Sequence, residues 1–185
     1  DATDRVGLNH SGYGMGVCVA DVNQDGWNDF VMTQWGADYL YINQQGVSFS
    51  KHVLETTVET QWSTSCAFGD LDGDLDLDLY ITRYVNFQMN GNHNCQSVEG
   101  QGYCNPSAYA GQKDALYLNN GLGQFTNHSI QAGIDQGSND RGLGVVIADL
   151  NKDHYLDIYV ANDGSKNRLY LNNGKAEFTD VGLRS

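Results

Sequence analysis

Three short acidic stretches decide the fold of this chain: DVNQDGWND at Asp21–Asp29, DLDGDLDLD at Asp70–Asp78 and DLNKDHYLD at Asp149–Asp157. Each one follows a run of small and β-branched residues and precedes a second run rich in Val, Ile, Leu or Tyr. Such runs favour β-strands, so each acidic stretch is predicted to be a loop that joins two strands. Because strands lie on both sides, a helix–loop–helix calcium motif is excluded.

Each acidic loop belongs to a repeat with two further predicted strands. A tyrosine-containing strand that ends in Asn or Gly comes next, as in YLYINQQG, ALYLNNG and RLYLNNG. A short strand with a phenylalanine, as in SFSKHV, QFTNHS or EFTDVG, then closes the unit. The middle repeat is longer than the others, and its extra residues are assigned to an inserted loop at 86–112, which is rich in Asn, Gln and Gly.

Four-stranded repeats of this length are typical of β-propeller blades. We therefore expect an all-β domain over residues 1–185 with almost no helix and with blades at about 12–54, 62–130 and 140–181. Three blades are too few to close a ring and leave two apolar flanks exposed. Further blades of a longer chain, other subunits or an open stack of blades could each cover them. The start, DATDRVGL, reads like the tail of a preceding blade, which a head-to-tail contact with the end, EFTDVGL, would supply.

The composition is strongly acidic, with 23 Asp and Glu against 10 Lys and Arg and a formal net charge of -13. This balance opposes nucleic acid and anionic membrane surfaces as partners and favours cations. No stretch approaches the length of an apolar membrane span, and the first residues lack the regions of a signal peptide. We expect either a processed chain or an excerpt of a longer one.

The acidic loops place oxygen ligands at alternate positions, as a calcium site requires. Positions 1, 3, 5 and 9 would supply side chains and position 7 a backbone carbonyl, which suits the six to eight oxygens that Ca²⁺ takes. About three structural Ca²⁺ ions are predicted. The expected side-chain ligands are Asp21, Asn23, Asp25, Asp29, Asp70, Asp72, Asp74, Asp78, Asp149, Asn151, Asp153 and Asp157. The expected carbonyl ligands are those of Trp27, Asp76 and Tyr155.

The three loops are not expected to be equal. Position 6 needs a sharp turn that favours glycine, and only the first loop has one, at Gly26; the others have Leu75 and His154. On this ground the first loop ranks best, although the second brings four carboxylates against three in each of the others. The alternative is that the loops are Asp- and Asn-rich turns capped by their own backbone hydrogen bonds. Mg²⁺ is less suited because it keeps its waters.

These residues resemble the FG-GAP/VCBS repeat family, in particular the secreted propellers of the cartilage-acidic-protein and ASPIC/UnbV-associated type. The resemblance rests on the three acidic loops, on LYLNNG-x-G-x-FT at 116–126 and its counterpart at 169–179, and on the stretch at 142–163. It also includes the Tyr-Cys-x-Pro pattern that begins at Tyr103. Repeats of this family form calcium-binding propeller blades, as in integrin α-subunits and several lectins. The resemblance therefore implies the fold and says little about activity.

Four cysteines fit an oxidising, extracellular setting, where millimolar Ca²⁺ also fills weak sites. Cys95 and Cys104 bracket the inserted loop and are expected to form a disulfide. Cys18 and Cys66 lie three and four residues before the first Asp of their loops, which places them on opposite faces of their strands. We expect two buried free thiols there in preference to a second bridge.

The sequence contains two glycosylation sequons, at Asn9 and Asn127. Such tripeptides often arise by chance, so the simplest expectation is that neither is modified. In a secreted protein from a glycosylating host, both would be plausible surface sites.

The leading functional hypothesis is a non-enzymatic extracellular scaffold or adhesion module. Its partners would be copies of itself, further blades or other extracellular proteins. The alternative is a lectin-like propeller that binds carbohydrate through Trp35 or Trp62, with Tyr84 a third aromatic residue at a strand end. A calcium-dependent polysaccharide lyase ranks lowest because no clustered base and charge neutraliser is visible. Nucleophile elbows, zinc-protease motifs and phosphate loops are also lacking, so no catalytic residue is assigned.

Overall fold

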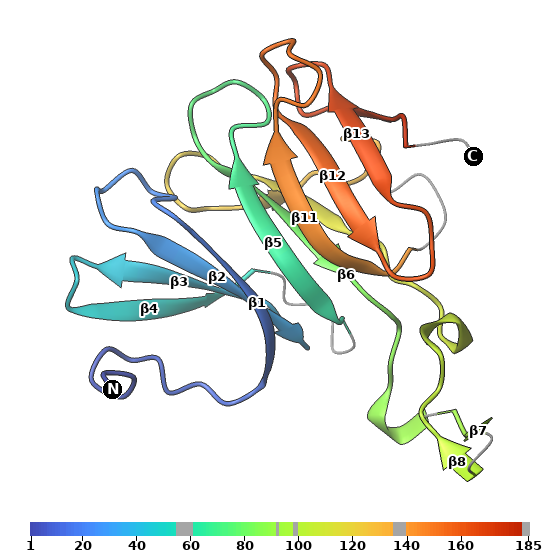
Figure 1. Ribbon diagram of the computed structural model, residues 1–185. Helices are drawn as coiled ribbons and strands as arrows, with labels where there is room; N and C mark the ends of the chain where they lie inside the picture. The colour runs from blue at the N-terminus through green and yellow to red at the C-terminus, as the bar shows by residue number, and fades with distance from the viewer. Residues whose placement is uncertain (55–60, 92, 98–99, 135–139, 183–185) are drawn as a thin grey trace.

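The computed structural model describes residues 1–54, 61–91, 93–97, 100–134 and 140–182, and it contains three four-stranded antiparallel sheets (Figure 1). The predicted all-β class with blade-like repeats is confirmed. The first blade consists of β1 (Tyr13–Ala20), β2 (Asp29–Trp35), β3 (Tyr39–Gln44) and β4 (Ser48–Val53). The middle blade consists of β5 (Ser63–Gly69), β6 (Asp78–Arg83), β9 (Ala115–Leu118) and β10 (Thr126–Asn127). The third blade consists of β11 (Gly142–Ala148), β12 (Asp157–Asn162), β13 (Arg168–Asn172) and β14 (Phe178–Asp180).

The insertion between β6 and β9 has a small structure of its own. It contains a hairpin of β7 (Cys95–Ser97) and β8 (Gly100–Gly102) and the short 3-10 turns η1 (Met89–Gly91) and η2 (Pro106–Ala108). The hairpin was not expected from the sequence, because its strands have only three residues each. It projects at the bottom right of Figure 1, whereas the three acidic loops lie at the opposite end of the blades.

The first strands of the blades, β1, β5 and β11, run side by side through the molecule (Figure 1). Each blade therefore packs a face against its neighbour, and one apolar core fills each of the two interfaces. The core between the first and middle blades includes Val22, Val31 and Leu79. The core between the middle and third blades includes Leu71 and Tyr80. The alternation of side chains along β6 feeds both cores, because successive residues point to opposite faces of a sheet.

The same alternation corrects the expectation of free thiols at Cys18 and Cys66. The two cysteines form a disulfide between β1 and β5, with their Cα atoms 5.7 Å apart. Because blades stack face to face, the side of β1 that faces the middle blade meets the opposite side of β5. Placement on opposite strand faces, which was taken as evidence against a bridge, is therefore what a bridge between neighbouring blades requires.

The N-terminal segment packs on the first blade in the same way as the end of the middle blade packs on the third blade. The backbone carbonyl of Val6 accepts from the N–H of Phe49 in β4, as that of Ala132 accepts from the N–H of Phe178 in β14, both at 2.9 Å. Gly7 and Gly133, which follow, both have a positive φ. Residues 2–8 thus pack on the first blade as the tail of a preceding blade would.

Both outer flanks of the three-blade stack expose apolar side chains. On the first blade these are the outward residues of β1, namely Tyr13, Met15, Val17 and Val19. On the third blade they are Leu143, Val146, Tyr159 and Leu150. Neither flank has a neighbouring blade within the part of the chain that the structure describes. No helix among the described residues is long and apolar enough to cross a membrane.

Candidate metal loops

The aspartate at position 9 of each acidic loop is the buried anchor of that loop. Its two oxygens accept one backbone N–H from position 2 of the loop and one from the end of the third strand of the same blade. Asp78 accepts in this way from Leu71 and Asn119 at 2.9 and 3.0 Å. Asp29 and Asp157 repeat both bonds, and all three residues are at most 1% exposed. These carboxylates fix where the loop leaves the sheet.

The aspartate at position 1 shapes the turn of each loop. Asp70 accepts the backbone N–H groups of Gly73 and Leu75. Asp21 and Asp149 accept from the corresponding turns of their own loops. In the middle loop, carboxylate oxygens of positions 1 and 9 also lie within 4.8 Å of each other, as an oxygen-ligated cation site requires.

Among the described residues, the middle loop has the clearest cluster of metal-ligand type. Carboxylate oxygens of Asp70, Asp72 and Asp78 all lie within 4.8 Å of one another. Asp76, only 5% exposed, lies outside this cluster, and its carboxylate oxygen Oδ1 has no hydrogen-bond partner. A buried unpaired carboxylate oxygen is costly unless a cation or donor compensates it. The donor set of this loop therefore fits Ca²⁺, which prefers carboxylate and carbonyl oxygens.

The pKa values of the middle loop report the same crowding of negative charge. Burial raises the pKa of Asp78 to about 7, and the charges of Asp72 and Asp76 add to the shift. Burial, together with the neighbouring carboxylates, also raises the pKa values of Asp72 and Asp76. A divalent cation would oppose this repulsion and favour the ionised forms.

The first and third loops bring their predicted ligands together in a different way. Asn23 donates its amide to Asp25 at 3.0 Å, and Asn151 donates to Asp153 at 2.8 Å. The backbone N–H of each of these aspartates returns a bond to the Asn oxygen. Backbone N–H groups cap the middle loop in the same way, as the alternative of self-capped turns describes, so the amide donated from position 3 is what distinguishes the first and third loops. The geometry favours the middle loop as the strongest site, whereas the sequence ranking placed the first loop ahead.

The turn chemistry explains part of this difference. Position 6 has a positive φ in all three loops, at Gly26, Leu75 and His154. Position 4 also has a positive φ, at Gln24, Gly73 and Lys152, which the sequence analysis missed. The middle loop thus has its glycine at position 4, the first loop at position 6, and the third loop at neither. The third loop holds two non-glycine residues in a conformation that favours glycine.

Position 7 of each loop, predicted to offer a carbonyl, also places its side chain on a turn of the same blade. The Trp27 ring covers Gly46, and the Tyr155 ring covers Gly174, so closely that a Cβ at either glycine would lie within 2.8 Å of the ring. Asp76 lies against Gly121 in the equivalent turn. Close approach as well as a positive φ requires glycine at 46 and 174, whereas at Gly121 only the positive φ does.

A set of asparagines that the sequence analysis did not single out joins the loops of neighbouring blades. Asn119 donates its amide to Val22 O of the first loop and to Leu77 O of its own blade, at 2.8 and 3.2 Å. Asn172 donates likewise to Leu71 O and Leu156 O, at 2.8 and 3.0 Å. Asn43 makes only the bond within its own blade, to Asn28 O. The sequence signal that could have identified these residues is the Asn at the end of each tyrosine-containing strand.

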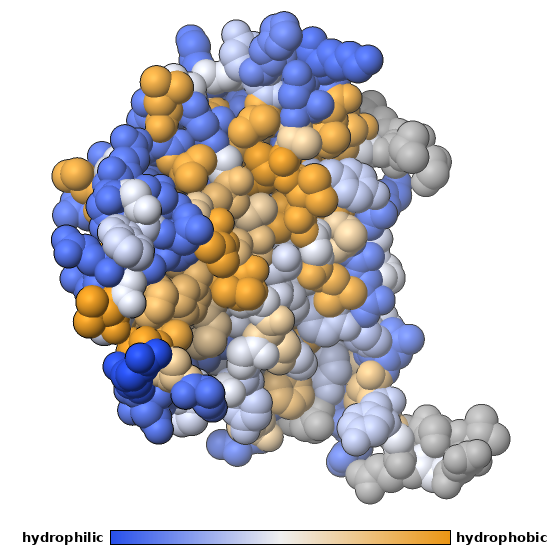
Figure 2. Space-filling model, turned by 60° about the vertical axis from the view of Figure 1, so that its left-hand side comes forward, coloured by the Kyte–Doolittle hydropathy of each residue, from blue (hydrophilic) through white to orange (hydrophobic). Residues whose placement is uncertain are grey.

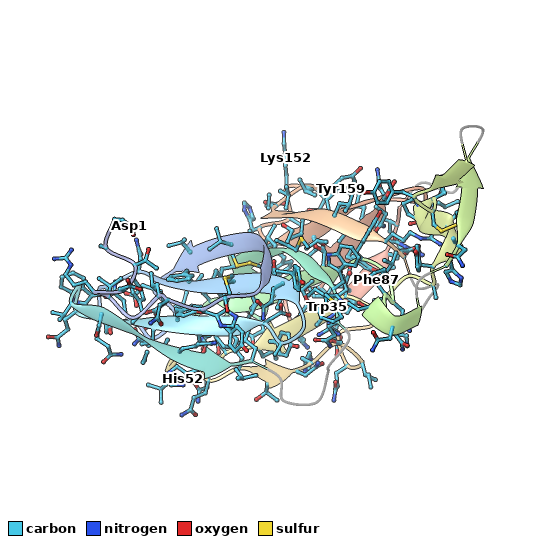
Figure 3. All side chains as sticks on the ribbon, turned by 90° about the horizontal axis from the view of Figure 1, so that it is seen from below. Asp1, Trp35, His52, Phe87, Lys152 and Tyr159 are labelled. Atoms are coloured by element: carbon cyan, nitrogen blue, oxygen red, sulfur yellow. A yellow bond between two sulfur atoms is a disulfide. The ribbon has the colours of Figure 1, made fainter. Side chains whose placement is uncertain are left out.

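The aromatic residues proposed for sugar stacking pack against the base of the insertion. Trp35 donates its indole N–H to the carbonyl of Phe87, and the two residues lie close together in Figure 3. Trp62 meets the rings of Tyr84 and Phe87 edge-on, with centroids 5.5 and 5.6 Å apart. Phe87 continues the chain of contacts to Tyr109. These rings fix the insertion to the blades.

The remaining predicted residues lie at the surface or in the insertion. Asn9 and Asn127 are both exposed, and the Asn127 side-chain oxygen accepts from Ser129. Cys95 and Cys104 form a disulfide across the β7–β8 hairpin, with Cα atoms 5.1 Å apart. The two disulfides fit an oxidising compartment.

Comparison with known proteins agrees with this architecture. A family model for FG-GAP-like repeats matches residues 21–81 and 107–160, more than half of the chain. Cartilage acidic protein 1 of Mus musculus and that of Homo sapiens are each 38% identical to this chain over 69 residues. Each match covers 36% of this chain and 10% of the relative.

A lectin of Agrocybe aegerita, solved in work on its specific recognition of non-reducing terminal N-acetylglucosamine, resembles the structure with a TM-score of 0.48 and 17% identity. That match covers 91% of this chain and 38% of the lectin chain. Because the family model matches two stretches that include all three acidic loops and more than half of the chain, the chain belongs to the family of FG-GAP-like repeat proteins.

Proposed function

We propose that this chain is a non-enzymatic extracellular scaffold or adhesion module whose acidic loops bind structural Ca²⁺ and whose two open flanks pack against further blades. The observation that carries the proposal is the unfinished interface at both ends of the stack. The disulfides and the repeat family support an extracellular location. The loops provide oxygen ligands without an arrangement of acid, base and nucleophile.

The two flanks complement each other as the internal interfaces do. In the internal interfaces, an asparagine of one blade donates to the position 2 carbonyl of the preceding loop. On the open flanks, Asn43 and Leu150 are the corresponding donor and acceptor residues. The first blade also already carries residues 2–8, packed like the tail of a preceding blade. These features support a head-to-tail contact in which a blade like the third precedes a blade like the first.

The apolar surface gives this contact a driving force. Val17 is 62% exposed and Val146 55% exposed on their respective flanks. Figure 2, in which the side with the first blade turns toward the viewer, shows a band of hydrophobic side chains bordered by hydrophilic ones. Contiguous exposed apolar surface of this kind marks interaction sites. Copies of the same chain are the partner that the complementary flanks support best.

Light scattering of the native chain tests the assembly. With millimolar Ca²⁺ we expect particles larger than the 20.3 kDa monomer, and smaller ones after chelation. Val17→Asp and Val146→Asp should each reduce the particle size. Val47→Asp is the matched control, because Val47 is even more exposed, at 73%, but lies in the β3–β4 turn. A monomer with and without Ca²⁺ would contradict self-assembly.

Calorimetric titration with CaCl₂ tests the metal separately. Asp72→Asn gives the middle loop the amide that the other loops have at this position, so we expect weaker binding at the tightest site. Asp4→Asn removes the same charge from an exposed residue outside the loops and should leave binding unchanged. Absence of calcium binding in the wild type would overturn the metal part of the proposal and leave the assembly test intact.

Carbohydrate binding through aromatic stacking has less support as a second function. The Trp35 and Trp62 rings are partly buried and face other aromatic residues, and the Trp62 indole nitrogen is fully buried. An open stacking platform would present a ring face to solvent.

A further inference from the structure

The first strand of the third blade, β11, contains a glycine that a single copy of the chain does not require. A Cβ built at Gly144 would meet no atom within 4 Å, and the φ of Gly144 is not positive. Glycine weakens a strand interior, so a residue with a side chain would suit this position better. Neither turn geometry nor packing against the described residues therefore accounts for Gly144.

The equivalent residue of the first blade shows where such a glycine is needed. Gly16 and Gly144 both lie five residues before the first Asp of their acidic loops. A Cβ at Gly16 would lie 2.5 Å from the backbone oxygen of Thr64, in β5 of the neighbouring blade. Glycine is thus required at 16 because the first strand of the next blade approaches closely. Gly144 shares a strand face with the exposed Val146, on the flank where no described residue takes the part of β5.

The Cys18–Cys66 disulfide shows which residues would meet in a contact of this kind. Cys18 lies three residues before the first Asp of its loop, and Val146 has the same place in the third blade. Cys66 lies four residues before its Asp, and Val17 has that place in the first blade. The Cα atoms of the two cysteines are 5.7 Å apart, whereas Val146 and Val17 are 55% and 62% exposed. The open flanks therefore present the two halves of an interface that is complete between the first and middle blades.

The connecting segment of this contact is already in place on the first blade. Between the middle and third blades, the residues after β10 pass over to β14, where the Ala132 carbonyl accepts from the N–H of Phe178. On the first blade, residues 2–8 make the same contact through the Val6 carbonyl and the N–H of Phe49. A third blade that packs on this flank need not supply a connecting segment, so two separate chains can form the contact.

The number of blades decides how such contacts continue. Each copy contributes three blades, and closed propellers typically have four to eight. Copies joined through this contact have blade numbers that are multiples of three, and six is the only such multiple in that range. In Figure 1, β4 and β13 lie on opposite sides of β1, β5 and β11, as they do in blades that fan out around a common axis.

We propose that two copies of this chain close head to tail into a ring of six blades. Val146 of each copy lies beside Val17 of the other, and each Gly144 faces the backbone of Met15, the counterpart of Thr64. This proposal rests on the proposed function, because it specifies the partner of the open flanks. It adds which residues meet and that the assembly stops at two copies, since a ring leaves no flank open.

Sedimentation equilibrium of the full chain with millimolar Ca²⁺, over a range of protein concentrations, tests the closure. We expect one associated species with twice the 20.3 kDa mass of the monomer and nothing larger at the highest concentration. Gly144→Ala should weaken association roughly tenfold or more, because each ring would press the added Cβ twice against a neighbouring backbone. At a concentration where both proteins are monomeric, its thermal unfolding should match that of the wild type, because the Cβ meets nothing within 4 Å in a single copy.

Cysteine pairs test which residues meet. Val17→Cys combined with Val146→Cys should give, on mild oxidation, a covalent dimer without a ladder of larger products. Val47→Cys combined with Val146→Cys is the matched control, because Val47 is exposed but lies in the β3–β4 turn, away from the flank. The control pair should remain largely monomeric under the same oxidation.

The possible failures separate the ring from the proposed function. A ladder of cross-linked chains, or particles that grow with concentration, would overturn the ring and leave self-assembly intact. Dimers that form equally well in Gly144→Ala, or that cross-link as readily through the control pair, would overturn the assigned contact. A monomer at every concentration would overturn the ring together with self-assembly, and would assign the flanks to blades of another polypeptide.

Discussion

Leu71 of the middle blade and Leu150 of the third occupy the same position, directly after the first Asp of an acidic loop. Leu71 is 1% exposed because the third blade covers it, whereas Leu150 is 47% exposed. Tyr80 and Tyr159, in equivalent strand positions, differ in the same way, at 0% and 38%. One sequence plan thus gives a core residue or a surface residue, and the neighbouring blade decides which.

This difference teaches that the blade is not the unit of stability. Like other repeats, each blade buries its apolar face only against the next one. The acidic loop takes part in that contact, since its position 2 residue supplies both a buried side chain and an accepting carbonyl. The loop therefore links the proposed metal site of one blade to the packing of the following blade.

Truncating Leu71 and Leu150 in turn is the most direct test of this difference in burial. Leu71→Ala should cost about 3 kcal/mol of unfolding free energy, because it leaves a cavity in the core between the middle and third blades. Leu150→Ala should change it by less than about 0.5 kcal/mol. Urea unfolding at a concentration where light scattering shows monomers would measure both.

An equal cost for the two leucine variants would contradict the assigned difference between the blades. Under assembling conditions the comparison becomes sharper. Under those conditions, Leu150→Ala should also lower the unfolding free energy if a following blade covers Leu150.

The second test concerns the asparagines that join the loops. Asn172→Ala removes two bonds from its amide, to Leu71 O and Leu156 O, and should cost about 2 kcal/mol. Asn43→Ala removes a single bond of this kind, to Asn28 O, and should cost about 1 kcal/mol. Thermal unfolding of the two variants in the same buffer gives the comparison. If Asn43→Ala were the more harmful, the bond between blades would have little weight.

The strands and acidic loops could be predicted from the sequence because they depend on local pattern. Small and β-branched runs on both sides of Asp70–Asp78 leave little choice but a strand, a loop and a strand. The paired cysteines Cys95 and Cys104 are close in sequence and were equally accessible to this reasoning.

Features that depend on how blades stack were missed. The Cys18–Cys66 disulfide and the amide bonds of Asn119 join residues that are far apart in the sequence. The ranking of the metal loops weighed glycine at position 6 against the number of carboxylates, while the fold also places position 4 in a left-handed conformation. The sequence showed every one of these residues but not the face on which it lies.

The next test replaces Asp114, an acidic residue of the middle blade, with the residue type that the third blade has at the equivalent position. Asp114 accepts the Tyr80 hydroxyl and the Arg83 backbone N–H, and burial raises its pKa to about 6. The third blade has Asn167 at this position. As the pH falls from 7 to 5, folded wild type takes up a proton on Asp114 before the unfolded chain does. Its unfolding free energy should therefore rise by about 1 kcal/mol relative to Asp114→Asn.

Urea unfolding of wild type and Asp114→Asn at several pH values, with the same calcium concentration throughout, isolates this group. The other aspartates titrate in both proteins and cancel in the difference. If the difference in unfolding free energy between wild type and Asp114→Asn stays constant between pH 7 and pH 5, the pKa of Asp114 is not raised.

The smallest expected effect comes from giving the third loop the glycine of the middle loop. Lys152 has φ 68° at position 4, where Gly73 has φ 83°. Relief of the left-handed conformation favours Lys152→Gly by about 1 kcal/mol, and the greater freedom of the unfolded chain takes back part of it. A net gain of about 0.5 kcal/mol is expected in chelator, measured by urea unfolding.

The reverse change, Gly73→Ala, provides the control for this test. A Cβ there would meet nothing closer than Gly174 O at 4.0 Å, so only the backbone conformation is tested. It should destabilise the chain by about 1 kcal/mol. If neither substitution changes stability, the turns tolerate any residue at position 4, and the stronger cluster of the middle loop must come from its additional carboxylate alone.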